Sequence, residues 1–124
     1  MREIVILGST GSIGLQALEI VAANPGKFKV VGLASGSKNL QLLLSQAEKF
    51  NVPIIGTTAD TSAIKDGIAG VHVIDGATAA AQIASLPCDI VLNGINGSIG
   101  LEPTLAALAA GNLVALANKE SLVA

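Results

Sequence analysis

Residues 4–14 read Ile-Val-Ile-Leu-Gly-Ser-Thr-Gly-Ser-Ile-Gly, four apolar residues followed by a glycine cluster. An apolar run that stops at glycines predicts a buried strand ending in a tight turn. Apolar residues then recur on one helical face, at Leu15, Leu18, Val21 and Ala22. The stretch therefore predicts a strand, a glycine turn and a helix that follow one another directly.

The glycines Gly8, Gly11 and Gly14 have the spacing G-x-x-G-x-x-G. A helix start exposes unpaired N–H groups and the positive end of the helix dipole, which together suit a phosphate. Glycines let the backbone approach such a ligand and let the helix pack on the strand. The alternative is a tight turn without a ligand. The hydroxyl residues between the glycines favour the phosphate-binding interpretation.

Composition limits the class of protein. The chain has 124 residues, enough for one domain, and its net charge of -2 and two aromatic residues argue against a nucleic-acid partner. No apolar stretch approaches the roughly 18 residues that a membrane span needs, and no signal peptide is expected at the N-terminus. Cys88 is the only cysteine, so an intrachain disulfide is impossible and we expect a cytoplasmic protein.

Further strands and helices alternate along the chain. We expect strands at 28–34, 52–55, 71–74, 89–92 and 113–116, and helices at 39–50, 60–66, 77–86, 102–110 and from 120 onward. This order predicts an α/β fold: a Rossmann-like, doubly wound, mainly parallel sheet with helices on both faces, in a single domain. Ligands of such sheets lie outside the carboxyl ends of the strands. The turns at 8–14, 35–39, 93–97 and 118–120 should meet there.

The turn after the second strand indicates which dinucleotide binds. In this fold an acidic residue about 20 residues beyond the glycine turn binds the ribose of NAD, whereas a basic residue accommodates the 2′-phosphate of NADP. The chain has Ser37, Lys38 and Asn39 there and no acidic residue. This pattern favours NADP, the alternative for Lys38 being an ordinary solvated lysine.

Lys119 follows the last strand at the start of an expected helix. A lysine there opposes the helix dipole, so either an anionic substrate lies nearby or the side chain points into water. His72 and Cys88 have no partner residues at metal-ligand or catalytic spacing. We expect both to be structural.

Several motifs resemble the 1-deoxy-D-xylulose 5-phosphate reductoisomerase family. They are residues 6–14, Asn24-Pro25, residues 103–107 and the closing Leu-Ala-Asn-Lys-Glu-Ser-Leu-Val at 116–123. The resemblance implies an enzyme that converts this phosphorylated sugar to 2-C-methyl-D-erythritol 4-phosphate for isoprenoid synthesis. It also implies NADPH, a divalent metal (magnesium or manganese) and a homodimer for the full-length protein.

The resemblance also implies roles for particular residues. Thr10, Gly11, Ser12 and Ile13 would hold the cofactor pyrophosphate, and Gly36, Lys38 and Asn39 the 2′-phosphate. Asn118 and Glu120 would contact the cofactor, and Lys119 the substrate. The family often has Gly-x-Asn at the second turn, and this chain is one residue longer there.

The family's metal-binding carboxylates and its lid lie downstream of the Lys-Glu-Ser motif. We therefore expect residues 1–124 to be the NADPH-binding domain alone, with no metal ligand or catalytic residue and no activity by itself. Two alternatives stay open: a domain of another NADP-dependent dehydrogenase, or a non-catalytic dinucleotide-sensing domain. Short-chain dehydrogenases rely on a Tyr-x-x-x-Lys pair, and this chain has no tyrosine. Lys119 argues against a sensor.

Overall fold

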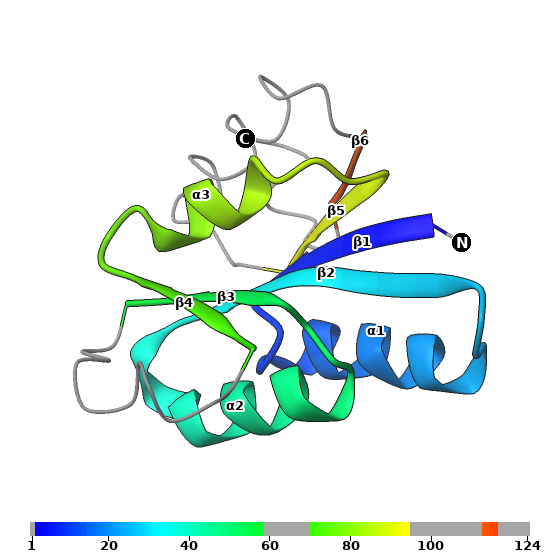
Figure 1. Cartoon of the computed structure of the whole chain (residues 1–124), viewed down its shortest axis with the longest axis horizontal. Coiled ribbons are helices and arrows are strands. Elements are labelled where there is room, and N and C mark those ends of the chain that lie inside the picture. Colours follow the sequence, from blue (N-terminus) through cyan, green and yellow to red (C-terminus); the bar gives the residue numbers. More distant parts are fainter. Residues whose placement is uncertain (1, 59–69, 95–112, 117–124) are drawn as a thin grey trace.

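The computed structural model describes residues 2–58, 70–94 and the strand at 113–116 (Figure 1). Its strands are β1 (Arg2–Leu7), β2 (Phe28–Ser35), β3 (Ile54–Thr57), β4 (His72–Asp75), β5 (Ile90–Asn93) and β6 (Leu113–Leu116). Its helices are α1 (Ser12–Ala23), α2 (Leu40–Lys49) and α3 (Ala79–Ala84), with a 3-10 turn, η1, at Ser37–Asn39.

The strands form one six-stranded sheet in the order β4-β3-β2-β1-β5-β6, with every neighbouring pair parallel. The chain moves outward from β1 to β4 and then returns to the other side of β1 at β5. The strand order therefore reverses between β1 and β5. In a doubly wound sheet, the carboxyl ends of two such strands border the ligand crevice.

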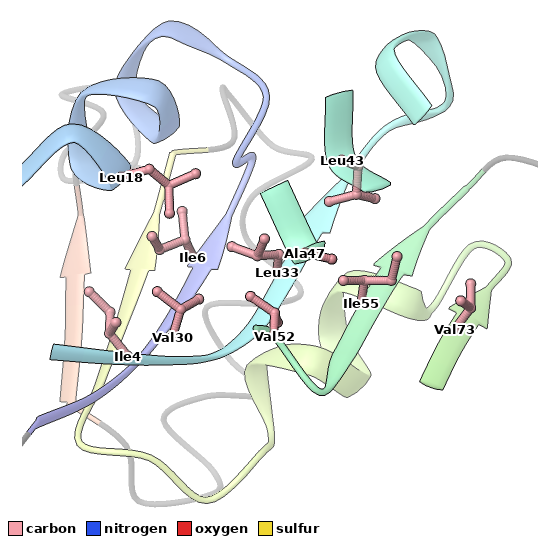
Figure 2. Close-up of a cluster of buried hydrophobic side chains, with 10 residues drawn as sticks. All are labelled: Ile4, Ile6, Leu18, Val30, Leu33, Leu43, Ala47, Val52, Ile55 and Val73. Carbon is pink, nitrogen blue, oxygen red and sulfur yellow. The ribbon is translucent and has the colours of Figure 1, made fainter. Parts of the chain in front are cut away.

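Helices cover both faces of the sheet, with α1 and α2 on one and α3 on the other (Figure 1). Figure 2 shows the core beneath α1 and α2, which comprises Ile4, Ile6, Leu18, Val30, Leu33, Leu43, Ala47, Val52, Ile55 and Val73. The core beneath α3 comprises Val5, Leu7, Ala34, Ile83, Ala84 and Val91. Successive residues of β1 alternate between these cores, which explains why a strand buried on both faces is uniformly apolar. The predicted fold class is confirmed.

A bulge interrupts the pairing of β1 with β2. Ile4 pairs with Val30, whereas Val5 pairs with Gly32, so Val31 is an extra residue. A Cβ on Gly32 would lie 2.8 Å from Leu86 Cδ1 and 3.1 Å from Ile83 Cγ2. Glycine at this position therefore lets β2 lie close to α3 and the loop that follows it.

The helix α1 differs from its prediction. It begins at Ser12 rather than after Gly14, and its buried residues are Gly14 and Leu18. Leu15 is 40% exposed, and Ala22 is exposed too. Both line an open groove between α1 and α2. The predicted apolar face is therefore only partly correct, because the close approach of Gly14 to the preceding turn sets the rotation of the helix.

Other boundaries shift by one or two residues. β3 begins at Ile54, two residues later than predicted, since Pro53 has no N–H for the ladder. α3 is shorter than the predicted 77–86. The predicted helices at 60–66, at 102–110 and from 120 onward lie outside the described residues. None of the helices in the described part of the chain has the length and apolarity needed to span a bilayer.

Candidate functional site

The glycine turn, residues 8–11, is held by backbone hydrogen bonds. The amides of Gly8 and Ser9 both donate to the carbonyl of Ala34, at 2.8 and 3.1 Å, and the amide of Gly11 donates to the carbonyl of Gly8 at 3.1 Å. Gly8 has a φ of 75°, which glycine adopts readily. The turn is thus fixed against the end of β2 before any ligand binds.

The start of α1 is left without a cap. Gly11 occupies the N-cap position and has no side chain to offer, and the first turn of the helix carries no acidic residue. The amide of Leu15 makes the first helical bond, to the carbonyl of Gly11 at 2.9 Å. Within the described residues the preceding amides, from Ser12 to Gly14, have no acceptor. They leave a concentrated positive potential that suits an anion.

The glycines of this segment have different structural roles. A Cβ on Gly14 would lie 2.4 Å from Gly8 O and 2.5 Å from Ser9 Cα, both backbone atoms. A Cβ on Gly11 would meet only Gly8 O, at an ordinary 3.5 Å. Gly14 is therefore required for the helix to pack on the turn, whereas Gly11 leaves open space in front of the uncapped amides.

The lysine turn, residues 35–39, lies beside the glycine turn. A hydrogen bond between Thr10 Oγ1 and Ser35 Oγ connects the two turns. Gly36, Lys38 and Asn39 are all exposed at this edge of the sheet. Asn39 precedes α2 but makes no side-chain capping bond. A short 3-10 turn leads into the helix instead.

Buried polar side chains support both turns from behind. Gln46 of α2 donates from Nε2 to the carbonyl of Ser9 at 2.9 Å, and Thr57 at the end of β3 donates from Oγ1 to the carbonyl of Gly36 at 3.3 Å. Neither residue was predicted as part of the site. The one signal for Gln46 is a polar residue at the helical spacing of buried Leu43.

The reversal of strand order completes the site. At the end of β5, the amide of Gly94 donates to the carbonyl of Leu7 at 2.9 Å, next to the glycine turn. A Cβ on Gly94 would lie 3.2 Å from Leu7 O and 3.5 Å from Ile13 Cβ. The carboxyl ends of β1, β2 and β5 therefore meet around the start of α1. This arrangement can hold one anionic group at the uncapped amides and a second beside Lys38.

The structure brings together seven of the predicted site residues: Thr10, Gly11, Ser12 and Ile13 at the start of α1, and Gly36, Lys38 and Asn39 at the lysine turn. Asn118, Lys119 and Glu120 lie outside the described residues, as do residues 95–97 of the predicted third turn. The lysine turn contains no acidic residue. It therefore has no carboxylate that would bind the ribose 2′-hydroxyl of NAD or repel the 2′-phosphate of NADP.

Neither His72 nor Cys88 joins this site. His72 is exposed on β4, the edge strand. Burial and the neighbouring Asp89 carboxylate raise the pKa of the Cys88 thiol, which makes it a poor nucleophile. Within residues 2–58 and 70–94, no three His, Cys, Asp or Glu side chains come together as a metal site would require.

Comparisons with a family model and with known proteins all indicate the same family. The family model described as 1-deoxy-D-xylulose 5-phosphate reductoisomerase matches residues 4–124. The protein of that name from Beutenbergia cavernae is 54% identical over 129 residues, covering 99% of this chain and 33% of the relative. The one from Rhodococcus jostii is 52% identical over 123 residues, covering 98% of this chain and 30% of the relative.

Solved structures agree. The reductoisomerase from Zymomonas mobilis in complex with NADPH superposes with a TM-score of 0.87 at 35% identity, over 98% of this chain and 33% of that one. A reductoisomerase in complex with NADPH, fosmidomycin and magnesium gives a TM-score of 0.89 at 35% identity, over 99% and 31% of the two chains. This chain spans about a third of the length of the relatives it matches.

Proposed function

The chain belongs to the 1-deoxy-D-xylulose 5-phosphate reductoisomerase family, and we propose that residues 1–124 are the NADPH-binding domain of such an enzyme. The observation that carries this proposal is the uncapped start of α1 at the reversal of strand order, with an exposed lysine at the adjacent turn. Pyrophosphate fits the first feature and a 2′-phosphate the second. The solved relatives in complex with NADPH support the same choice.

Each part of the site would then have one task. The backbone amides of Ser12 and Ile13, with Thr10 and Gly11 beside them, bind the pyrophosphate. Gly36, Lys38 and Asn39 bind the 2′-phosphate, where Lys38 contributes a positive charge. Asn118 and Glu120 contact the cofactor further along. NADPH, when bound, supplies the hydride. The domain's contribution to the reaction is to fix the position of the nicotinamide relative to the substrate.

For the whole enzyme we propose the family's reaction, conversion of 1-deoxy-D-xylulose 5-phosphate to 2-C-methyl-D-erythritol 4-phosphate. Lys119 is the proposed substrate contact, since a cation at the start of the helix expected there from the sequence is best explained by an anionic or hydroxyl partner. The proposed magnesium or manganese ligands lie outside residues 1–124. The family resemblance also supports a homodimer in the cytoplasm.

Cofactor titration tests the proposal for this chain. Calorimetry or NADPH fluorescence should show NADPH binding at least about tenfold more tightly than NADH, because only NADPH carries the phosphate that Lys38 contacts. The difference should shrink as salt screens that contact. Equal affinity at low salt would contradict the NADP assignment, and no binding of either dinucleotide would contradict the domain assignment.

Kinetics test the role of Lys119. In a protein of the relatives' full length that contains these residues, Lys119→Ala should leave NADPH affinity nearly unchanged and lower kcat/KM about ten- to a hundredfold, the effect of losing a charge-assisted hydrogen bond. Unchanged kinetics would indicate that the Lys119 side chain points into solvent and does not contact the substrate.

The 124-residue chain alone should not reduce the sugar phosphate even with NADPH and magnesium. Reduction by this chain alone would contradict the proposal that residues 1–124 form only the cofactor-binding part of the enzyme.

A further inference from the structure

One polar side chain is buried among the apolar ones of α2. Leu43 and Ala47 face the sheet (Figure 2), and Gln46 lies on the same helix face with 5% of its surface exposed. Its Nε2 donates a 2.9 Å hydrogen bond to the carbonyl of Ser9, a residue that is fully buried. The side chain thus joins α2 to the glycine turn, 37 residues earlier in the chain.

The amide group of this glutamine is only partly satisfied by its contact with Ser9. Gln46 Oε1 and Ser9 Oγ are both buried and have no hydrogen-bond partner among the described residues. A buried polar atom without a partner destabilises the folded state. An apolar side chain of the same length at position 46 would remove one such atom, but it would also take away the hydrogen bond that the buried Ser9 carbonyl accepts. The glutamine is better explained by the carbonyl that it holds.

The carbonyl of Ser9 matters because it belongs to the same peptide unit as the N–H of Thr10. The carbonyl of Ser9 and the N–H of Thr10 belong to the same planar, trans peptide, so they point in opposite directions. Because Gln46 holds the carbonyl toward α2, the Thr10 N–H points away from α2. This N–H has no acceptor in the part of the chain that the structure describes. It is therefore available to a ligand, together with the uncapped amides of α1.

We propose that Gln46 is a positioning residue for the dinucleotide pyrophosphate. It fixes the Ser9–Thr10 peptide so that the Thr10 N–H faces the phosphate, without touching the cofactor itself. The inference rests on the proposed function, because it assumes that NADPH binds at the glycine turn. It adds a residue from α2 to a site otherwise formed by β1, α1 and the lysine turn.

Gln46→Met tests this role, since methionine keeps the length of the side chain and removes the N–H donor. Leu43→Met is the matched control, a methionine on the same buried face of α2 that replaces a side chain with no hydrogen-bond donor. Each protein is titrated with NADPH and with adenosine 2′-monophosphate, which reaches the lysine turn but carries no pyrophosphate. Thermal unfolding followed by circular dichroism checks that each variant is folded, and Gln46→Leu serves as a second variant.

We expect Gln46→Met to weaken NADPH binding about tenfold while adenosine 2′-monophosphate binds as to the unaltered chain, and Leu43→Met to change neither. Unchanged NADPH affinity in folded Gln46→Met or Gln46→Leu would overturn the inference alone. Equal losses for both ligands, or for both methionine variants, would also overturn it, because they indicate general loosening. Failure of the unaltered chain to bind NADPH would overturn the proposed function, and this inference with it.

Discussion

The glycine turn and the lysine turn lie side by side and are linked by the Thr10–Ser35 hydrogen bond, yet they are constructed differently. The glycine turn is fixed by three backbone hydrogen bonds and by the contact of Gly14 with backbone atoms. The lysine turn is exposed, and a Cβ on Gly36 would meet no atom within 4 Å.

This difference in constraint suits the two turns to different kinds of dinucleotide recognition. Backbone amides at the glycine turn can bind any dinucleotide pyrophosphate, because their positions follow from the fold. Side chains at the lysine turn can distinguish one dinucleotide from another, because few packing contacts constrain them. Substitutions at the glycine turn should therefore affect folding or all dinucleotide binding. Those at the lysine turn should affect mainly the preference for NADPH.

The largest effect is expected from Gly14→Ala. The new Cβ would lie 2.4 Å from Gly8 O, and backbone atoms cannot move aside as a side chain can. We expect the free energy of unfolding to fall by about 3 kcal/mol, the upper end for overpacking, measured by denaturant titration with circular dichroism. Gly36→Ala is the control and should change stability by less than about 0.5 kcal/mol. Similar losses for both would mean that the two turns are equally constrained.

Gly11→Val should abolish binding without unfolding the chain. Gly11 has φ -82° and ψ 173°, which valine tolerates, and its Cβ would make only an ordinary contact. The side chain would instead fill the space where the pyrophosphate approaches, so NADPH affinity should fall by at least roughly a hundredfold. Calorimetry measures the loss, and an unchanged circular dichroism spectrum excludes misfolding. Retained binding would make the turn purely structural.

Lys38→Ala should alter dinucleotide preference. Removing the charge should weaken NADPH binding about tenfold, as expected for a charge-assisted contact, and leave NADH binding unchanged. Lys27→Ala is the matched control, since Lys27 is also exposed but precedes β2, at the opposite end of the strand. A parallel loss for both dinucleotides, or an effect of Lys27→Ala as large, would contradict a specific role for Lys38.

Thr57→Val should produce the smallest of these effects. The substitution removes the 3.3 Å hydrogen bond to the carbonyl of Gly36 while keeping the shape of a side chain that is 1% exposed. A neutral hydrogen bond contributes about 1 kcal/mol to stability, so NADPH affinity should fall by at most about fivefold, through a less ordered lysine turn, and NADH affinity should not change. Exposed Thr58, changed to valine, is the control. A loss for NADH of the same size would mean that Thr57 acts on the whole site.

The sequence predicted those parts of the fold that depend on local periodicity. The alternation of apolar strands with amphipathic helices was enough for the parallel, doubly wound sheet, and the glycine spacing was enough to locate the glycine turn. Long-range contacts were not predictable in this way. Leu15 fits an apolar helical face as well as Leu18 does, but the contact of Gly14 with the turn leaves Leu15 40% exposed.

The same reason explains the residues that were missed at the site. Gln46 and Thr57 act across 37 and 21 positions of sequence, through hydrogen bonds to carbonyl groups. Any residue type has a carbonyl, so the sequence around Ser9 or Gly36 gives no sign of its partner. Residues that present their own amides or charge, such as Gly11 and Lys38, follow strands and could be located from the strand ends alone.

The bulge at Val31 has a consequence for insertions and deletions. Seven residues of β2, Phe28 to Ala34, lie beside six residues of β1, Arg2 to Leu7, yet both ends of the pairing stay level. The bulge thus accommodates a one-residue difference in strand length within the sheet. It leaves the position of Ala34 unchanged, and the carbonyl of Ala34 accepts the hydrogen bonds that hold the glycine turn. Deleting Val31 should restore a regular strand and leave the site in place. The lysine turn has no comparable bulge, so an added or deleted residue there would move the Lys38 charge that we propose distinguishes NADPH from NADH.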